Sequence, residues 1–242
     1  MATVVIRADR PVEGRALTDL AVATPLTSAQ AATLYRRAMG DVCEAVDASG
    51  ADLLVTYPDD ASEAKLRAVV DGAVEDPATV RFEPQVGSTP AAKMGNTVTH
   101  LLETEAATSV GVLDPTAVFV TRSTIDQAAM TLRRHDAVVG PAAAGAVYYA
   151  GFTDTIDFTD VYDPPVVETI VETATAADRS TAVLDPLPTL GTPSGLRSAL
   201  PLLWARKRAG HAVPERTSEY VADIGLRMKP NDGEGRLDIV TE

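Results

Sequence analysis

The sequence predicts a single α/β domain with a mostly parallel central sheet. Short, continuous apolar runs alternate with segments of helical periodicity, which is the pattern of βαβ units whose sheet is covered on both faces. A chain of 242 residues buries about 70% of the surface that it exposes when unfolded, so it needs no disulfide or metal to hold its fold. Because no repeat, low-complexity tract or linker divides the chain, we expect one domain over residues 1–228 and a polar tail over residues 229–242.

The N-terminal third supplies the first expected strands and a long helix. Thr3–Ile6 is a continuous apolar run that predicts a buried strand. A helix is expected to begin after Thr27, because Gln30 three residues later completes a capping box, and to end near Ser49, before Gly50. The next expected elements are a strand at Ala51–Tyr57, a helix at about Ser62–Val74 and a strand at Thr79–Phe82.

The middle of the chain is expected to supply the centre of the sheet. Thr89 followed by a proline predicts a helix that begins there and runs to about Ala106. Ala117–Thr121 is another continuous apolar run, and we expect Val118–Val120 to be buried within the sheet. A helix at about Ile125–Arg134 and a strand at Asp136–Val139 are expected to follow.

The last third is expected to complete the alternation. The expected elements are a strand at Ala146–Phe152, a helix at Pro165–Ala177 and a strand at Thr181–Leu184. Thr192 and Pro193 repeat the threonine–proline pair that opens a helix. The polar segment after Met228 carries glycine, asparagine and aspartate, so we expect it to be a loop or a frayed terminus.

The charge and composition of the chain argue against several kinds of partner. A net charge of −13 disfavours nucleic acid and anionic membrane, because both are bound through a basic footprint. The first residues do not show a basic segment followed by a long apolar core, so we expect no signal peptide. The most apolar stretch of the chain is interrupted by glycine and proline, so we expect no membrane span. The single cysteine, Cys43, excludes an internal disulfide. We therefore expect a cytoplasmic protein.

The kinds of charged residue also indicate a habitat. The chain has only 4 lysines against 17 arginines, and 21 aspartates against 13 glutamates. Acidic, lysine-poor surfaces are typical of proteins from salt-loving microbes, because concentrated salt screens the self-repulsion of such a surface. The sequence predicts a halophilic protein, and the alternative is an ordinary acidic bacterial one.

Four short motifs follow one another along most of the chain. The first is A-D-R-P-V-E-G-R-A-L-T-D-L at residues 8–20, directly after the first expected strand. The second is Q-V-G at residues 85–87 with K-M at 93–94, and the third is L-R-R-H-D-A-V-V-G-P-A at 132–142 with Y-Y-A-G at 148–151. The fourth is L-G-T-P at residues 190–193. In this order they resemble small GT-A-fold glycosyltransferase-like proteins, relatives of the nucleotidyltransferases that load GMP onto molybdopterin or phospholactate.

This resemblance implies a GT-A-like, Rossmann-like three-layer fold and a nucleoside diphosphate or nucleotide sugar as the ligand. Such proteins hold phosphate oxygens with cationic side chains and backbone N–H groups. The candidate nucleotide- and phosphate-binding residues are Arg10, Gly14, Arg15, Thr18, Lys93 and Arg122. No residue is assigned a catalytic role.

Arg122 is the most informative of these candidates. It is expected just past the C-terminal end of the strand at Ala117–Thr121, where ligands bind in open α/β sheets. There its guanidinium would pair directly with a diphosphate in place of a metal ion. The alternative is an exposed arginine in a decayed site.

The charged positions of the family pattern are largely replaced in this chain. The pattern has lysines where Asp9 and Leu17 stand, and an arginine where Asp19 stands. Its acidic S-D-T-P turn, which follows the central strand, is placed at Thr121–Thr124, where no acidic residue occurs. Its two later acidic positions are placed at Ala144 and Gly191.

Loss of these carboxylates bears on the metal that such transferases use. We expect no metal cofactor, because alanine, glycine and arginine cannot ligate Mg²⁺ or Mn²⁺. Asp114 and Asp126 are alternative ligands, but each also has a structural interpretation, Asp114 as the start of a turn and Asp126 as an acidic residue near a helix N-terminus.

The leading hypothesis is a nucleotide-sugar-dependent glycosyltransferase-like protein with a metal-free or inactive site. The first alternative is a non-catalytic binding or interaction protein on the same fold. The second is guanylyl transfer in cofactor biosynthesis, although that chemistry also requires the replaced carboxylates.

Overall fold

The computed structural model describes residues 2–231 and 237–241. Within them lies a seven-stranded sheet of order β3-β2-β1-β4-β6-β5-β7. Strand β6 is antiparallel to its neighbours β4 and β5, and every other neighbouring pair is parallel. The strands are β1 (Ala2–Arg7), β2 (Asp52–Tyr57), β3 (Arg81–Pro84), β4 (Ser109–Leu113), β5 (Ala137–Pro141), β6 (Val147–Phe152) and β7 (Thr181–Val183). The predicted mostly parallel sheet is confirmed.

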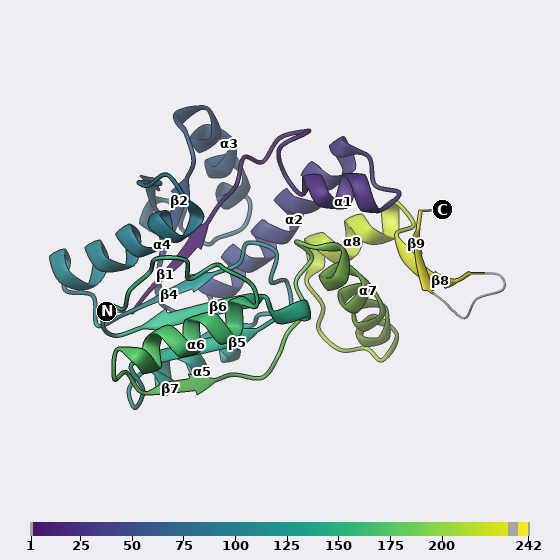
Figure 1. Ribbon diagram of the computed structural model, residues 1–242. Coiled ribbons are helices and arrows are strands. Elements are labelled where there is room, and N and C mark those ends of the chain that lie inside the picture. Colours follow the sequence, from purple (N-terminus) through teal and green to yellow (C-terminus); the bar gives the residue numbers. More distant parts are fainter. Residues whose placement is uncertain (1, 232–236, 242) are drawn as a thin grey trace.

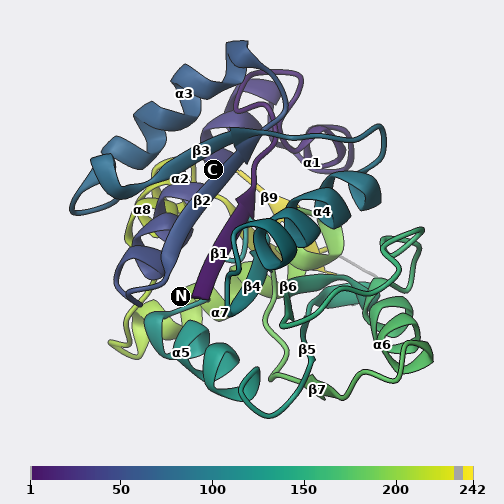
Figure 2. The same ribbon diagram turned by 90° about the vertical axis from the view of Figure 1, so that its left-hand side faces the viewer.

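Helices cover both faces of this sheet and make the fold three-layered (Figures 1 and 2). One face packs against α2 (Ser28–Asp47), α3 (Asp60–Asp71) and α5 (Arg122–Thr131). The other packs against α4 (Pro90–Thr99), its π-helical continuation η2 (His100–Thr104) and α6 (Val166–Ala176). Two short 3-10 turns, η1 (Pro77–Thr79) and η3 (Ala143–Gly145), lie in the connections.

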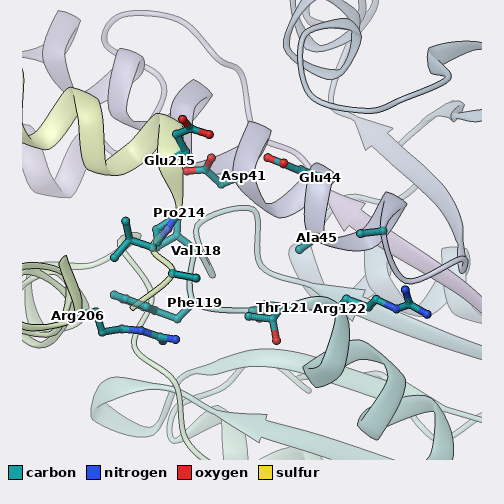
Figure 3. Close-up of a pocket in the computed structure, with 14 residues that line it drawn as sticks. Asp41, Glu44, Ala45, Val118, Phe119, Thr121, Arg122, Arg206, Pro214 and Glu215 are labelled. Carbon is teal, nitrogen blue, oxygen red and sulfur yellow. The ribbon is translucent and has the colours of Figure 1, made fainter. Parts of the chain in front are cut away.

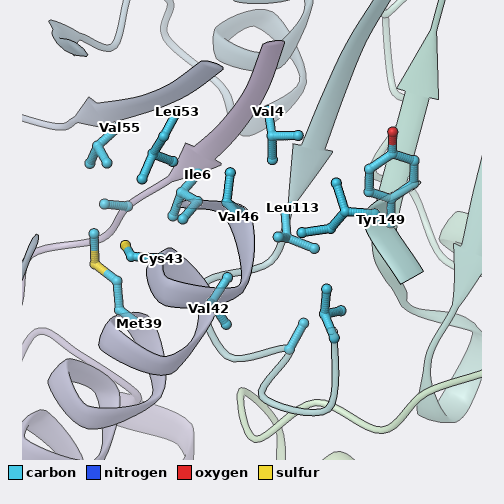
Figure 4. Close-up of a cluster of buried hydrophobic side chains, with 14 of the residues drawn as sticks. Val4, Ile6, Met39, Val42, Cys43, Val46, Leu53, Val55, Leu113 and Tyr149 are labelled. Carbon is cyan, nitrogen blue, oxygen red and sulfur yellow. The ribbon is translucent and has the colours of Figure 1, made fainter. Parts of the chain in front are cut away.

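Alternation along the strands explains why both faces are apolar. In β1, Val4 and Ile6 point to the α2 side, whereas Val5 between them points to the α4 side. Figure 4 shows the first of these cores, where Val4, Ile6 and neighbouring strand residues meet Val42 and Cys43 of α2. Each such buried side chain contributes about 1.5–3 kcal/mol of transfer free energy. Burial also raises the pKa of the Cys43 thiol to about 12, so this cysteine is a packing residue.

The predicted helix start at Thr27 is confirmed in detail. The Thr27 hydroxyl accepts a hydrogen bond from the Gln30 backbone N–H at 3.2 Å, and the Gln30 side-chain oxygen accepts one from the Thr27 N–H at 2.9 Å. The two threonine–proline pairs also cap helices, because Thr89 accepts from Ala92 and Thr192 accepts from Gly195 at the starts of α4 and α7 (Pro193–Arg208). Local side-chain chemistry therefore fixed these three helix starts.

The centre of the sheet differs from the prediction. Residues 117–120 are buried in turns and irregular backbone, Thr121 is the exposed N-cap of α5, and the central strand is β4, which the sequence analysis missed. Val118 and Phe119 are as buried as strand residues, but they pack against helices without pairing with a strand. An apolar run shows burial and not pairing. In β4 the pattern is broken by Gly111, where a Cβ would lie 2.5 Å from the Tyr149 hydroxyl.

The C-terminal part of the chain makes a third core beside the sheet. Helix α7, α8 (Glu215–Asp223) and the hairpin of β8 (Arg227–Pro230) and β9 (Leu237–Val240) pack with α1 (Thr18–Ala23) against α2 (Figure 1). The prediction of a loop or frayed terminus after Met228 was wrong for the described residues, because Leu226 and Ile239 are buried and hold the hairpin down. Residues 232–236 and 242 of that segment lie outside the described residues.

Among the described residues, no helix has both the length and the apolar character that crossing a membrane requires.

Candidate functional site

A cavity of about 360 Å³ lies where the carboxyl ends of β1, β2 and β3 meet the first turn of α4. We call it the strand-end cavity. Ligands of open α/β sheets bind at this edge, because the loops that follow parallel strands gather there. Its lining residues are Arg7, Asp9, Arg10, Gly14, Arg15, Thr18, Pro58, Gln85, Pro90 and Lys93.

The structure brings five of the six predicted site residues together here. Arg10, Gly14, Arg15 and Thr18 come from the loop after β1 and the start of α1, and Lys93 comes from the first turn of α4. They share one cavity although more than seventy residues of chain separate Thr18 from Lys93. This arrangement is set by the parallel sheet, which delivers successive loops to the same edge.

Arg122 lies elsewhere. It begins α5 and lines a separate cavity of about 260 Å³ with Phe119, Arg206 and Glu44. In Figure 3 its side chain extends away from Asp41 and Glu215, and its guanidinium pairs with Asp126 at 3.3 Å. The expectation that Arg122 directly follows the central strand was wrong, because that strand ends at Leu113 and residues 114–121 intervene.

Hydrogen bonds fix the first residues of the loop after β1. The Ala8 N–H donates to the Thr56 carbonyl at 2.9 Å, which continues the pairing of β1 with β2. The Asp9 N–H donates to the hydroxyl of buried Tyr35 at 2.7 Å, and a guanidinium N–H of Arg36 donates to the Pro11 carbonyl at 3.0 Å. The loop is therefore anchored to α2.

Two glycines of the predicted motifs have distinct roles around the cavity. Gly14 has φ +68° and open space around it, so only its backbone conformation requires glycine. Gly87 has φ +139°, and a Cβ there would lie 2.8 Å from the backbone nitrogen of Lys93. The Q-V-G segment thus packs directly beneath the helix turn that carries Lys93. Gln85 fixes the same segment by donating to the Ala8 carbonyl at 2.7 Å and the Thr56 carbonyl at 3.1 Å.

Cationic side chains dominate the cavity wall. Arg10 donates from Nε to Asp59 Oδ2 at 2.5 Å, which orients its exposed guanidinium. Within the described part of the chain, Arg15 and Lys93 form no ion pair. Lys93 and Pro90 lie in the first turn of α4, where the helix dipole adds positive potential. In a chain of net charge −13, four cationic side chains thus line one cavity.

A smaller cavity of about 60 Å³ adjoins the first, and Arg7 lines both. Its other wall includes Asp114, Tyr148 and Tyr162. The Arg7 guanidinium lies 3.8 Å from Asp9 and 5.7 Å from the ring centre of Tyr162. This group of partly buried polar side chains is at the end of β1 and β4, the two central parallel strands.

The protonation of this group follows from its surroundings. Burial raises the pKa of Asp114, and the negative charge of Asp9 adds to the rise, although hydrogen bonds from Thr116 and the charge of Arg7 oppose it. Burial acts to lower the pKa of Arg7, but Tyr162, Asp9 and Asp114 outweigh it, so the pKa of this arginine is raised. Arg7 therefore keeps its charge at any pH at which the protein is folded.

The strand assignment changes which residue follows the central strand. That residue is Asp114, directly after β4, whereas the sequence analysis placed the end of the central strand at Thr121. The position directly after the central strand is therefore acidic. Asp114 Oδ1 accepts hydrogen bonds from the Thr116 N–H and hydroxyl, both at 2.6 Å, and these fix the turn.

The donor set does not suit a divalent metal ion. No group of three histidine, cysteine, aspartate or glutamate side chains is placed to hold one among the residues that the structure describes. Asp114 and Asp9 both interact with the Arg7 guanidinium, a positive charge that a metal ion would have to approach. A divalent ion bound beside a diphosphate needs only one or two carboxylates, so the obstacle here is the positive charge of Arg7 and not the number of carboxylates.

Sequence reasoning missed Arg7 as a site residue and gave Asp114 only a secondary role. Both are the residues that end or follow the two central strands. Arg7 could have been recognised from its position, because it is a charged residue at the end of an otherwise apolar strand. A charge there lies at the ligand-binding edge of the sheet and not in the core. The signal of Asp114 was hidden because β4 itself was not predicted.

The comparisons with known proteins agree with this architecture. Residues 41–163 match the model of a family described as "Uncharacterized protein conserved in bacteria (DUF2064)", and the chain belongs to this family. No curated protein matches the chain.

Two solved structures illustrate the likeness of fold. The chain resembles a candidate nucleotide-diphospho-sugar transferase from Desulfovibrio desulfuricans G20, with a TM-score of 0.75 and 19% identity over 92% of this chain and 94% of that one. It also resembles 4-diphosphocytidyl-2C-methyl-D-erythritol synthase from Anaerococcus prevotii DSM 20548, with a TM-score of 0.52 and 10% identity over 84% of this chain and 98% of that one. The GT-A-like fold expected from the motifs is confirmed.

Proposed function

We propose that the chain binds the diphosphate of a nucleotide or nucleotide sugar in the strand-end cavity, as a transferase-like protein of the nucleotidyl- or sugar-transferring kind. One observation carries the proposal: four cations, Arg7, Arg10, Arg15 and Lys93, line a single cavity at the carboxyl edge of the sheet. Phosphate oxygens are the natural complement of such a set, because guanidinium and ammonium groups form charge-assisted hydrogen bonds with them. The names of the structural relatives, which refer to nucleotide and nucleotide-sugar chemistry, support the same ligand class.

Each residue of the strand-end cavity would make a different contribution to diphosphate binding. Arg15, from the loop after β1, and Lys93, from α4, both line the cavity and would each contact a phosphate oxygen, at about 1.5–3 kcal/mol per charged hydrogen bond. Arg10, held by Asp59, would contribute a pre-oriented guanidinium at little cost in side-chain entropy. Gly14, open and in the left-handed conformation, lets the loop backbone approach the ligand closely.

A non-catalytic binding protein is the second candidate, and the metal-poor donor set favours it. Transfer from a diphosphate requires stabilisation of the leaving phosphate, which a bound divalent ion commonly supplies. The two candidates share the ligand and differ in turnover. Product formation from a bound nucleotide sugar would establish the transferase, and binding without turnover would establish the binding protein.

A thermal-shift panel tests the proposal. The ligands are ADP, GDP, CDP, UDP and the common sugar conjugates of the last three, each in EDTA, with the corresponding nucleosides as controls. At a concentration of 100 Kd a ligand adds about 2.7 kcal/mol to the stability of the folded state. At about 2–4 °C per kcal/mol for a chain of this size, the expected rise in Tm is about 5–10 °C.

The nucleosides should give little shift, because they lack the diphosphate that the cations hold. A matched pair of variants localises the effect: Arg15→Met should abolish most of the shift, whereas Arg134→Met, at an exposed arginine beyond α5, should not. Absence of any shift across the panel would refute the proposal.

A further inference from the structure

Arg7 has an unusual position for an arginine. It is the last residue of β1 and follows the buried run Val4–Ile6, yet its side chain is only 28% exposed. Its guanidinium lies at the boundary between the two cavities, with Asp9, Asp114 and the Tyr162 ring around it. No other cation lines both cavities among the residues that the structure describes.

The surroundings of Arg7 hold it in place from several elements. Asp9 comes from the loop after β1, Asp114 from the turn after β4, and Tyr162 from the segment between β6 and α6. Tyr35 of α2 fixes Asp9 through its backbone, and Thr116 fixes the Asp114 carboxylate. A guanidinium held in this way loses little entropy when it meets a ligand.

Asp9, in the loop that follows β1, pairs with the Arg7 guanidinium at 3.8 Å. Both residues line the strand-end cavity, so the charge pair stands at its boundary.

A divalent ion would not suit this arrangement. Asp114, the residue after the central strand, interacts with the charge of Arg7. An ion at Asp114 would lie beside that permanent positive charge, which opposes its binding.

We infer that Arg7 is the resident cation of this site, and that it takes the place of a divalent metal ion beside the bound diphosphate. The inference rests on the proposed function, since it concerns the same ligand. It assigns a role to a residue between the two cavities and implies that diphosphate binding requires no divalent metal.

The test uses inorganic pyrophosphate, which carries the diphosphate without a base, in a ³¹P NMR titration of the full chain. Wild-type protein should bind pyrophosphate equally well in EDTA and in Mg²⁺, or more weakly in Mg²⁺ because the ion competes for the ligand. Arg7→Met should weaken binding about 10- to 100-fold, as expected for one charged hydrogen-bonding group. Arg7→Lys should restore part of that loss, and Arg134→Met should bind like wild type.

Removal of Arg7 leaves Asp9 and Asp114 uncompensated, so Arg7→Met alone could fail to fold. The double variant Arg7→Met/Asp114→Asn removes one charge of each sign and keeps the shape of the carboxylate. It should fold, as checked by circular dichroism, and still bind pyrophosphate about 10- to 100-fold more weakly than Asp114→Asn does.

Mn²⁺ provides an independent readout. In electron paramagnetic resonance titrations the wild type should show no stoichiometric Mn²⁺ site, with or without pyrophosphate. A stoichiometric Mn²⁺ in the wild type, or pyrophosphate binding that strengthens tenfold or more with Mg²⁺, would overturn the inference and leave the proposed function standing. Nucleotide binding without pyrophosphate binding would also overturn it. No binding of pyrophosphate or of any nucleotide would overturn both.

Discussion

Replacing Gly87 by alanine should damage both the fold and the strand-end cavity. At φ +139° the backbone of Gly87 is in a region that residues with a Cβ rarely adopt, which costs about 1–3 kcal/mol. The added Cβ would also lie 2.8 Å from the Lys93 nitrogen and 2.9 Å from the Ala92 carbonyl carbon. Both are backbone atoms of α4, so no side-chain rotation relieves the clash, and overpacking of this kind costs about 1–3 kcal/mol more.

The two costs together predict a loss of about 4 kcal/mol, or about 8–16 °C in Tm for a chain of this length. Gly14→Ala is the matched control, because Gly14 lines the same cavity with φ +68° and has nothing within 4 Å of the added Cβ. It should lose only the cost of a left-handed alanine, about 1–2 kcal/mol.

Urea and thermal denaturation of both variants measure these losses, and the ³¹P titration measures the effect on the cavity. Gly87→Ala should also weaken pyrophosphate binding, because the displaced helix turn carries Lys93. Equal losses for the two variants, or a Gly87→Ala protein as stable as wild type, would show that α4 does not depend on close packing against this loop.

Four further predictions concern other parts of the molecule. Asp41→Ala should lower the free energy of unfolding, measured in urea, by about 2–4 kcal/mol. Buried Asp41 caps α8, because its carboxylate accepts hydrogen bonds from the backbone N–H groups of Arg216 and Thr217 at 3.1 and 2.8 Å. Glu44 is an exposed partner of the same arginine, so Glu44→Ala should cost only about 0–1 kcal/mol. Since burial raises the pKa of Asp41, the stability of the wild type relative to Asp41→Asn should fall as pH rises from about 4 through the folded pKa and stay level above it; a rise would contradict the assignment. Cys43, buried with a thiol pKa of about 12, should react with a disulfide reagent only when urea unfolds the protein, and rapid reaction of the native chain would contradict the core assignment. Tm should rise steeply between 0.1 and 3 M KCl if the acidic surface is an adaptation to salt, because screening removes the self-repulsion of a −13 chain, and a flat response would favour an ordinary acidic protein.

The sequence by itself determined the alternation of strands and helices along the chain, and local features such as helix caps. Apolar runs such as Thr3–Ile6 and Ala51–Tyr57 became parallel strands, and the capping box at Thr27 began a helix as predicted. These features depend on residues close together in the chain, so their physics is visible in the sequence. The motif after β1 was informative for the same reason, and its residues reached the predicted edge of the sheet.

Only the tertiary structure decided which apolar run pairs as a strand. Val118 and Phe119 are buried against helices, whereas β4, interrupted by a glycine that accommodates Tyr149, forms the centre of the sheet. Strand pairing depends on partners far along the chain, which hydrophobicity does not reveal. That one error moved Arg122 to the strand edge in the prediction and hid Asp114, the residue that occupies it.

The tertiary structure also decided the composition of the site and the fate of the C-terminus. Arg7, Asp9, Asp114 and Tyr162 come from three separate segments, and only the fold gathers their charges around one guanidinium. The segment after Met228 looked too polar to fold, yet a few buried residues such as Ile239 fix it as a hairpin against the third core. In both cases the stabilising free energy comes from contacts between residues that are far apart in the sequence. Those contacts form only when the sheet has set the positions of its loops.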